Sequence, residues 1–271
     1  MPLFDAHCHL QNERLLPHLD DAMRRATEAG VTGFMCCGTS EQDWPLLPDL
    51  ARRFPGVRLS FGLHPWYSGN RSNAWLDTLE RTLAAHPAAI GEIGLDHALD
   101  KATFADQETV FLAQIHLAGK LGLPVSIHCR RAYGRLMELL DEEGWPDSGF
   151  MIHSYSGSAE LVEPLIRRGA FLSFSGTITY TRNVHVREAL AAVPLEHLLI
   201  ETDSPDLMPN QSAKTPVTTD ALNPVNEPAF LVSVLETAAT IRTMQELELA
   251  ETTSLNARDL WNQRGDFSRT A

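Results

Sequence analysis

Two histidines separated by one residue lie near the start of the chain, in the segment Phe4-Asp5-Ala6-His7-Cys8-His9-Leu10. Successive side chains of a β-strand point to opposite faces, so a strand here places His7 and His9 on one face and Cys8 on the other. Two neutral imidazoles on one face suit a single divalent metal ion. Histidines at a strand end are also commonly satisfied by backbone carbonyls, so the metal interpretation requires ligands from later strands.

Short apolar segments alternate with helical patterns along the chain, and these elements must position the polar residues. Strands are predicted at about residues 4–10, 33–38, 57–62, 88–96, 124–128, 150–153, 170–175 and 198–201. Helices are predicted at about residues 14–29, 40–54, 73–85, 103–121, 132–143, 158–168 and 184–192, with two more after residue 224. We expect Ser40 to cap the second helix, and Thr243 with Glu246 to form a capping box at the last one.

This order of elements predicts the architecture. Strands that alternate with helices favour a parallel sheet with right-handed crossovers. Eight such units fit a closed (β/α)8 TIM barrel, and an open, doubly wound sheet is the competing arrangement. No composition break marks a linker and no internal repeat is found, so we expect one domain over residues 1–271.

Composition limits the classes of function. Of the 271 residues, 44% are hydrophobic and 21% are charged, which is typical of a soluble globular protein with a sizeable core. The formal net charge of -13 argues against a protein that coats long nucleic acid, since that role needs a basic face. It leaves room for a site that grips one or two phosphates through bound cations.

The cysteines indicate the cellular compartment. The chain has four cysteines, which lie in or directly after predicted strands: Cys8, Cys36, Cys37 and Cys129. Buried reduced thiols explain them better than a disulfide framework, which favours the cytoplasm. The sequence shows no charged-then-apolar leader and no run of 18 apolar residues, so we expect a cytoplasmic protein with no membrane partner.

Side chains of the metal-binding type fall near or just after the carboxyl ends of the predicted strands. They are His7, His9, Glu92, His128, His153 and Asp203. In a barrel, this end of the strands is where active sites are built. Six ligands exceed the need of one tetrahedral zinc ion and match a centre of two divalent metal ions. The mixed nitrogen and oxygen set suits Zn, Mn, Ni or Co, whereas Mg prefers oxygen ligands.

The positions of these ligands along the chain suggest how two ions would share them. We assign the first two histidines and Asp203 to one ion, and His128 and His153 to the other. Glu92 is the natural bridge because it comes from the middle of the barrel. Water held at such a centre has a lowered pKa and becomes a nucleophile near neutral pH. Asp203 could take its proton, although a plain ligand or a turn cap is its alternative role.

Seven motifs, in order from about Leu3 to Trp261, resemble the TatD family of metal-dependent DNase-like hydrolases of the amidohydrolase superfamily. They are Asp5-Ala6-His7-Cys8-His9, Gly62-Leu63-His64-Pro65, Gly91-Glu92-Ile93-Gly94-Leu95-Asp96, Ile127-His128-Cys129-Arg130, His153-Ser154-Tyr155-Ser156-Gly157, Glu201-Thr202-Asp203-Ser204-Pro205 and Asn226-Glu227-Pro228. The resemblance implies a (β/α)8 barrel, a two-metal centre with the six ligands named above, and phosphodiester hydrolysis, chiefly 3′–5′ exonuclease action on single strands. The segment 97–101 lacks the aromatic residue that many members place after Asp96, which leaves the substrate more open than the hydrolysis.

Three further features concern the substrate. Arg130 lies two residues after His128 and could bind a phosphate bidentately, although a structural or solvated arginine is an equal reading. His64 follows a strand and is a candidate substrate contact or a structural residue. The connection at 204–224 is long enough to cover a substrate, or to be an irregular surface excursion.

The leading interpretation is therefore a two-metal phosphodiesterase or deoxyribonuclease that acts on nucleic-acid ends or a small phosphodiester. A second enzyme class uses the same centre on carbon esters, lactones or amides, for example an aminoacyl-tRNA deacylase. A binding module without activity is the third class, and it would be expected to lack several ligands or Asp203. We predict no obligate protein partner.

Overall fold

The structure is a computed structural model, and it describes residues 2–210 and 225–261. Its single sheet has eight parallel strands in the order β1-β2-β3-β4-β5-β6-β7-β8. The strands are β1 (Leu3–Cys8), β2 (Val31–Cys37), β3 (Val57–Phe61), β4 (Ala88–Asp96), β5 (Val125–Arg130), β6 (Phe150–Ile152), β7 (Ala170–Phe174) and β8 (Leu198–Ile200). Because this order follows the chain without a reversal, it excludes the doubly wound alternative and confirms the TIM barrel.

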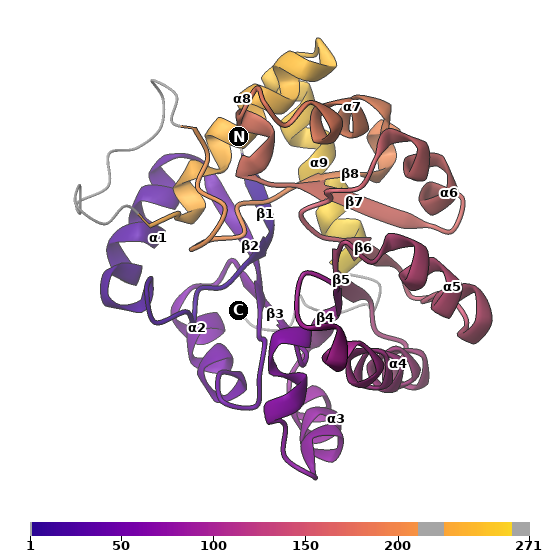
Figure 1. Ribbon diagram of the computed structural model, residues 1–271. Coiled ribbons are helices and arrows are strands. Elements are labelled where there is room, and N and C mark those ends of the chain that lie inside the picture. Colours follow the sequence, from indigo (N-terminus) through magenta and orange to yellow (C-terminus); the bar gives the residue numbers. More distant parts are fainter. Residues whose placement is uncertain (1, 211–224, 262–271) are drawn as a thin grey trace.

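Helices surround the strands on the outside of the barrel (Figure 1). They are α1 (Leu19–Glu28), α2 (Leu47–Arg53), α3 (Trp75–Ala85), α4 (Phe104–Leu121), α5 (Tyr133–Glu143), α6 (Val162–Ile166), α7 (Val184–Ala192), α8 (Leu231–Arg242) and α9 (Glu246–Trp261). In the described part of the chain, no helix is both long and apolar enough to cross a membrane. Of the predicted covering connection 204–224, residues 211–224 lie outside the described residues.

Two predicted helix caps are wrong. Ser40 caps no helix, because α2 begins at Leu47 after a 3₁₀ turn; the backbone N–H groups of Thr39 and Ser40 bind the Asp43 carboxylate instead. Thr243 is the C-cap of α8, with a left-handed backbone (φ 52°), and α9 begins only at Glu246. In both places, the chain needs a turn to end the preceding element before the next helix can start.

The seam between β8 and β1 closes next to the predicted ligands. The N–H of Asp203 donates to the carbonyl of His7 at 3.0 Å, and the N–H of His9 donates to the carbonyl of Ser204 at 2.8 Å. A buried bidentate pair then ties α1 to the segment after β8, with Arg25 Nε and Nη2 each 2.7 Å from a carboxylate oxygen of Glu227. Part of the Asn226-Glu227-Pro228 motif therefore has a structural role.

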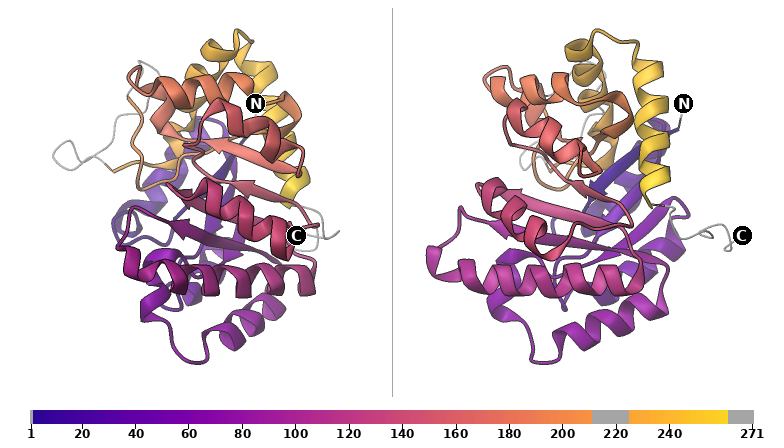
Figure 2. Two further views of the ribbon diagram at one scale, coloured as in Figure 1. Left: turned by 45° about the vertical axis from the view of Figure 1, so that its right-hand side comes forward. Right: turned by 90° about the vertical axis from the view of Figure 1, so that its right-hand side faces the viewer.

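The core has two parts, on either side of the strands. Outside the barrel, one face of the strands packs against the helices. Inside it, a smaller apolar cluster joins strand residues such as Phe4, Met35 and Met151 to Leu260 and Trp261 of α9. Helix α9 therefore covers one end of the barrel, beside the N-terminus, as the right-hand view of Figure 2 shows. The opposite end, where the strands finish, is left for a site.

Two strands carry one extra residue relative to their neighbours. In β1, Asp5 pairs with Phe34 and Cys8 with Cys36, so three steps along β1 match two along β2. In β4, Ile90 pairs with Val125 and Ile93 with Ile127, again three steps against two. An extra residue shifts the alternation of side chains beyond it to the other face. These two shifts lie directly before or at predicted ligands. A third shift lies at the start of the β1–β2 pair, where Leu3 and Phe4 pair with Val31 and Gly33 and the extra residue is in β2.

Candidate metal centre

The Glu92 carboxylate lies in the middle of the predicted ligands, and its two oxygens face different histidines. Oε2 is 3.4 Å from His7 Nε2 and 3.3 Å from His9 Nε2. Oε1 is 2.9 Å from His128 Nδ1 and 2.7 Å from His153 Nε2. Residues from β1, β4, β5 and the end of β6 thus meet around one carboxyl group. A carboxylate with this position is suited to bridge two cations.

Asp203 completes the group from the segment after β8. Its Oδ1 lies 3.4 Å from His9 Nε2 and 3.8 Å from His7 Nε2. The structure therefore brings together all six predicted ligands, and each of them except His128 is at least nine-tenths buried. The six residues do not separate cleanly into the two predicted sets of ligands. His153 lies with His7 and Asp203 in one set of potential ligand atoms as well as beside His128.

His64 lies inside this cluster. Its Nε2 is 3.2 Å from Glu92 Oε1, and its Nδ1 accepts the backbone N–H of Trp66 at 3.1 Å. It also forms a third potential ligand set with Glu92 and His128. Because the ring is buried and turned toward the carboxylate, it is placed to support the centre. The assignment of His64 to substrate binding stays a prediction.

The chemistry of the donors fits divalent cations. His7 Nε2 and His9 Nε2 face each other at 3.2 Å, and so do His128 Nδ1 and His153 Nε2. Two neutral imidazoles can share such a contact only if one donates and the other accepts. A cation accepts lone pairs from both nitrogens of a pair and from the nearby carboxylates. Five imidazoles and two carboxylates match the ligand preferences of Zn, Mn, Ni or Co.

Neutral groups orient the rings of the first two histidines. The Nδ1 atom of His7 lies 3.0 Å from the Ser126 hydroxyl, and the Nδ1 atom of His9 lies 2.8 Å from the Cys37 carbonyl. Since these contacts occupy Nδ1, each ring directs its Nε2 atom toward Glu92. Partners of this kind fix the tautomer and orientation of a ligating histidine.

Carboxylates orient His128 and His153, and neither carboxylate was predicted from the sequence. His128 Nε2 lies 3.4 Å from Asp96 Oδ2, and His153 Nδ1 lies 3.3 Å from Glu201 Oε1. Both acids are fully buried. A signal was available, since Asp96 ends β4 and Glu201 directly follows β8, at the same end of the barrel as the ligands. Carboxylates behind ligating histidines also raise the basicity of the ring.

Burial and the charges of neighbouring groups shift the pKa values of the acids and histidines in the cluster. Burial opposes ionisation of Glu92, but the charges of His153 and His64 and hydrogen bonds from His128 and His153 outweigh it, so its pKa falls well below the ordinary value. Burial lowers the pKa of His64 to about 4. For His9, burial lowers the pKa, but the hydrogen bonds that the ring donates to the Asp203 and Glu92 carboxylates outweigh it and raise the pKa well above the usual range. Metal binding here must displace protons, so affinity should fall as the pH is lowered.

Arg130 lies at the mouth of the barrel, beyond the ligands. Its side chain is 54% exposed, and Nη1 is 3.9 Å from Asp96 Oδ2. The guanidinium is therefore near the centre without being held by a bidentate partner. His97, the residue after Asp96, stacks on the Phe104 ring with 3.8 Å between the ring centroids.

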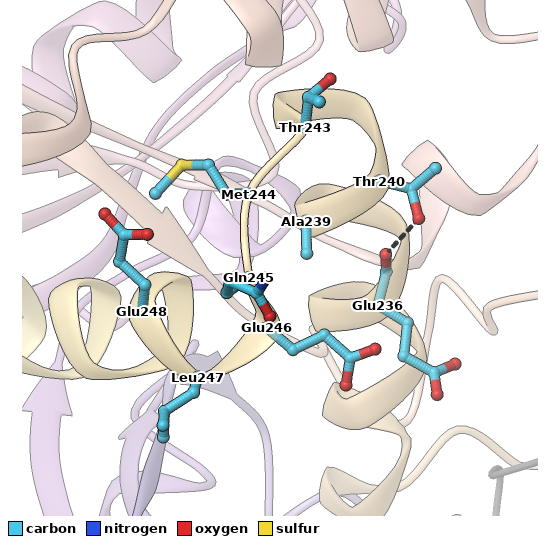
Figure 3. Close-up of a pocket in the computed structure, with 9 residues that line it drawn as sticks. All are labelled: Glu236, Ala239, Thr240, Thr243, Met244, Gln245, Glu246, Leu247 and Glu248. Carbon is cyan, nitrogen blue, oxygen red and sulfur yellow. Dashed lines mark hydrogen bonds between the residues drawn. The ribbon is translucent and has the colours of Figure 1, made fainter.

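A hollow of about 760 Å³ lies where α8 ends and α9 begins (Figure 3). Its lining includes Glu236, Met244 and Glu248, and it contains none of the six predicted ligands. Helix α8 runs back from the site end of the barrel, so this hollow lies at the other end. It has no part in the candidate centre.

The family model described as TatD related DNase matches residues 4–262. The chain belongs to this family. The 3'-5' ssDNA/RNA exonuclease TatD of Salmonella typhimurium is 36% identical over 264 residues, which cover 96% of this chain and 98% of that protein. The protein of the same name from Escherichia coli K12 is 33% identical over 267 residues, with 96% and 98% covered. The resemblance drawn from the seven motifs is thereby confirmed.

Solved structures agree with this placement in the TatD family. The TatD homolog YJJV from Escherichia coli K12 superposes with a TM-score of 0.86 at 30% identity, covering 96% of this chain and 98% of that one. A TatD family hydrolase from Entamoeba histolytica has a TM-score of 0.82 at 20% identity, covering 96% and 98%, and shows the shared fold. A fold of this kind, with the ligand clusters described above, implies the use of divalent metal.

Proposed function

We propose that this TatD family member hydrolyses phosphodiester bonds of single-stranded DNA or RNA from the 3′ end, with two divalent cations at the Glu92 cluster. The observation that carries the proposal is the position of Glu92, with one carboxylate oxygen toward His7 and His9 and the other toward His128 and His153. The TatD relatives named as 3'-5' ssDNA/RNA exonucleases support the choice of substrate.

Each residue would have a separate task. His7, His9 and Asp203 would hold one cation and the two later histidines the other, with Glu92 shared. Bound divalent cations supply positive charge to the phosphate and lower the pKa of water at the centre. Asp203 lies at the rim of the cluster, where its carboxylate would accept a proton as the phosphodiester is attacked. Arg130, exposed at the mouth, would hold a phosphate oxygen by charge-assisted hydrogen bonds.

The test is an activity panel on metal-reconstituted protein, with Zn, Mn, Ni, Co and Mg compared. The substrates are single-stranded DNA, single-stranded RNA, bis(p-nitrophenyl) phosphate, a lactone and an aminoacyl ester. We expect shortening of DNA and RNA from the 3′ end, and about two ions per chain by elemental analysis. Hydrolysis of the carbon esters alone would replace this proposal by the second enzyme class.

Two variants separate the roles within the panel. Asp203→Asn keeps an oxygen ligand but loses the base, so turnover should fall by about 10²–10⁴-fold while much of the metal is retained. Arg130→Ala should raise KM for DNA without a change in metal content. An Asp203→Asn protein with undiminished turnover would remove Asp203 from the proton transfer.

We also propose a cytoplasmic location. All four cysteines are free and buried in the structure, as a reducing compartment allows. The substrate would be a nucleic-acid end, and the proposal includes no obligate protein partner.

A further inference from the structure

Trp66 is an exposed tryptophan beside the metal centre. It lies in the 3₁₀ segment Pro65–Asn70 that follows β3, at the end of the barrel where the ligands meet. The residue is 53% exposed, and its neighbour Tyr67 is 39% exposed. The other four tryptophans of the chain are buried or partly buried. The mouth of the barrel thus presents an aromatic surface to solvent.

The Trp66 ring is held in place by groups that belong to the centre. Its Nε1–H donates to Asp96 Oδ2 at 2.7 Å, and its backbone N–H donates to His64 Nδ1 at 3.1 Å. The indole packs edge-on against the His64 ring, with 5.0 Å between centroids. Asp96 in turn contacts His128. An exposed ring that is already immobilised loses little conformational entropy when a ligand covers it.

A positive charge lies beside this ring. Arg130 Nη1 is 3.9 Å from the same Asp96 oxygen that accepts the indole N–H, and its side chain is 54% exposed. A cation next to an exposed aromatic ring is the combination that binds single-stranded nucleic acid, because the cation holds the backbone and the ring stacks on a base. A local site of this kind also explains how a chain with a net charge of -13 could bind a polyanion.

We propose that Trp66 stacks on a base near the 3′ end of the substrate strand, and that Arg130 holds the adjoining phosphate. This inference rests on the proposed phosphodiesterase function and adds a determinant of substrate class to it. The enzyme would then prefer nucleic acid over small phosphodiesters because it recognises a base as well as a phosphate. Stacking accepts any base, so the preference is for nucleic acid in general.

The test uses two single-stranded DNA oligonucleotides of equal length, one of them abasic at its two 3′-terminal nucleotides. With metal-reconstituted protein, Trp66→Ala should raise KM for the normal oligonucleotide by about 10-fold to 100-fold and leave KM for the abasic one unchanged. Trp66→Phe retains a stacking ring, so its KM should stay within a few-fold of wild type. The control is Trp145→Ala, because Trp145 also donates its indole N–H to an aspartate, Asp141 at 2.7 Å, but lies before β6 at the other end of the barrel.

Binding measured by fluorescence anisotropy in EDTA, where no hydrolysis occurs, is the second readout. The same base-dependent and Trp66-dependent difference is expected there. If the wild type cleaves neither oligonucleotide but shows this binding difference, the proposed function fails and the stacking site stands. The stacking site is overturned if Trp66→Ala binds and cleaves the normal oligonucleotide like the wild type, or if it weakens both oligonucleotides equally.

Discussion

The two halves of the candidate metal centre are built on different kinds of strand. His128 and His153 come from β5 and the end of β6, whose pairing with each other runs residue by residue without interruption. His7, His9 and Glu92 come from β1 and β4, each of which contains one extra residue. The regular strands obey simple alternation, and the irregular strands obey it only on each side of the extra residue.

The effect of the extra residue is visible in the packing. In β1, Phe4 and Ala6 belong to the cluster inside the barrel, yet Cys8 packs outside it, against the helices. Alternation counted from Phe4 would have placed Cys8 inside and turned His7 outward. In β4, Ala89 is inside and Ile93 is outside, so Glu92 can face the interior. The bulge re-aims a side chain, as bulges near active sites often do.

Replacing the residue that joins the two halves should have the largest effect. Glu92→Gln keeps the size of the side chain but loses the charge that faces both histidine pairs, so both cations should bind weakly. We expect turnover to fall by about 10³-fold, with a lower metal content. Turnover assays and elemental analysis test this, with Glu143→Gln on the exposed side of α5 as control. Full retention of two ions would show that the halves do not share Glu92.

The pairing of the irregular strand with the regular one can be broken at Gly94. This residue pairs with His128, and a Cβ there would lie 1.9 Å from the His128 carbonyl oxygen. Its φ of 150° is also unfavourable for other residues. We expect Gly94→Ala to lower the free energy of unfolding by about 3 kcal/mol and to reduce metal binding by His128.

Denaturant unfolding and metal titration measure both effects of Gly94→Ala. The matched control is Gly119→Ala in α4, where a Cβ would meet nothing within 4 Å. That substitution should raise the free energy of unfolding by about 0.5–1 kcal/mol, since alanine favours helix. Equal stability of the two variants would contradict the close approach of β4 and β5.

Removing the carboxylate charge behind His153, a histidine from a regular strand, should have a smaller effect. Glu201→Gln leaves an oxygen near His153 Nδ1 but removes the charge, so metal affinity should fall by about 10–100-fold. Competition with a chromogenic chelator measures this affinity. Glu196→Gln, an exposed site just before β8, should leave the affinity unchanged. If both variants bind metal like the wild type, Glu201 only fills space in the core.

Removing the neutral partner of His7, a histidine from an irregular strand, should have the smallest effect. Ser126→Ala removes the hydroxyl that contacts His7 Nδ1 at 3.0 Å, a single neutral hydrogen bond worth about 1 kcal/mol. Metal affinity should therefore fall by about fivefold, less than in Glu201→Gln. A larger loss than in Glu201→Gln would reverse the ranking of charged and neutral partners, and the same chelator titration decides between them.

The sequence by itself predicted the eight-strand order and singled out the six candidate ligands that the structure brings together. The order follows from apolar segments and helix patterns, which are local. These residues stood out because they lie near or just after the carboxyl ends of strands, and in a parallel barrel those ends meet. Alternation was also sufficient to place His128 and His153 together, because β5 and β6 have a regular register.

Only the tertiary structure decided which side chains of β1 and β4 face the interior, and which groups contact the histidine rings from behind. Register depends on how a strand fits its neighbours, so the extra residues of β1 and β4 cannot be read from one segment alone. The partners Asp96, Glu201 and Ser126 and the position of Trp66 depend on contacts between residues far apart in the chain. Packing of the strands fixes those distances, and a linear pattern contains no distance across the barrel.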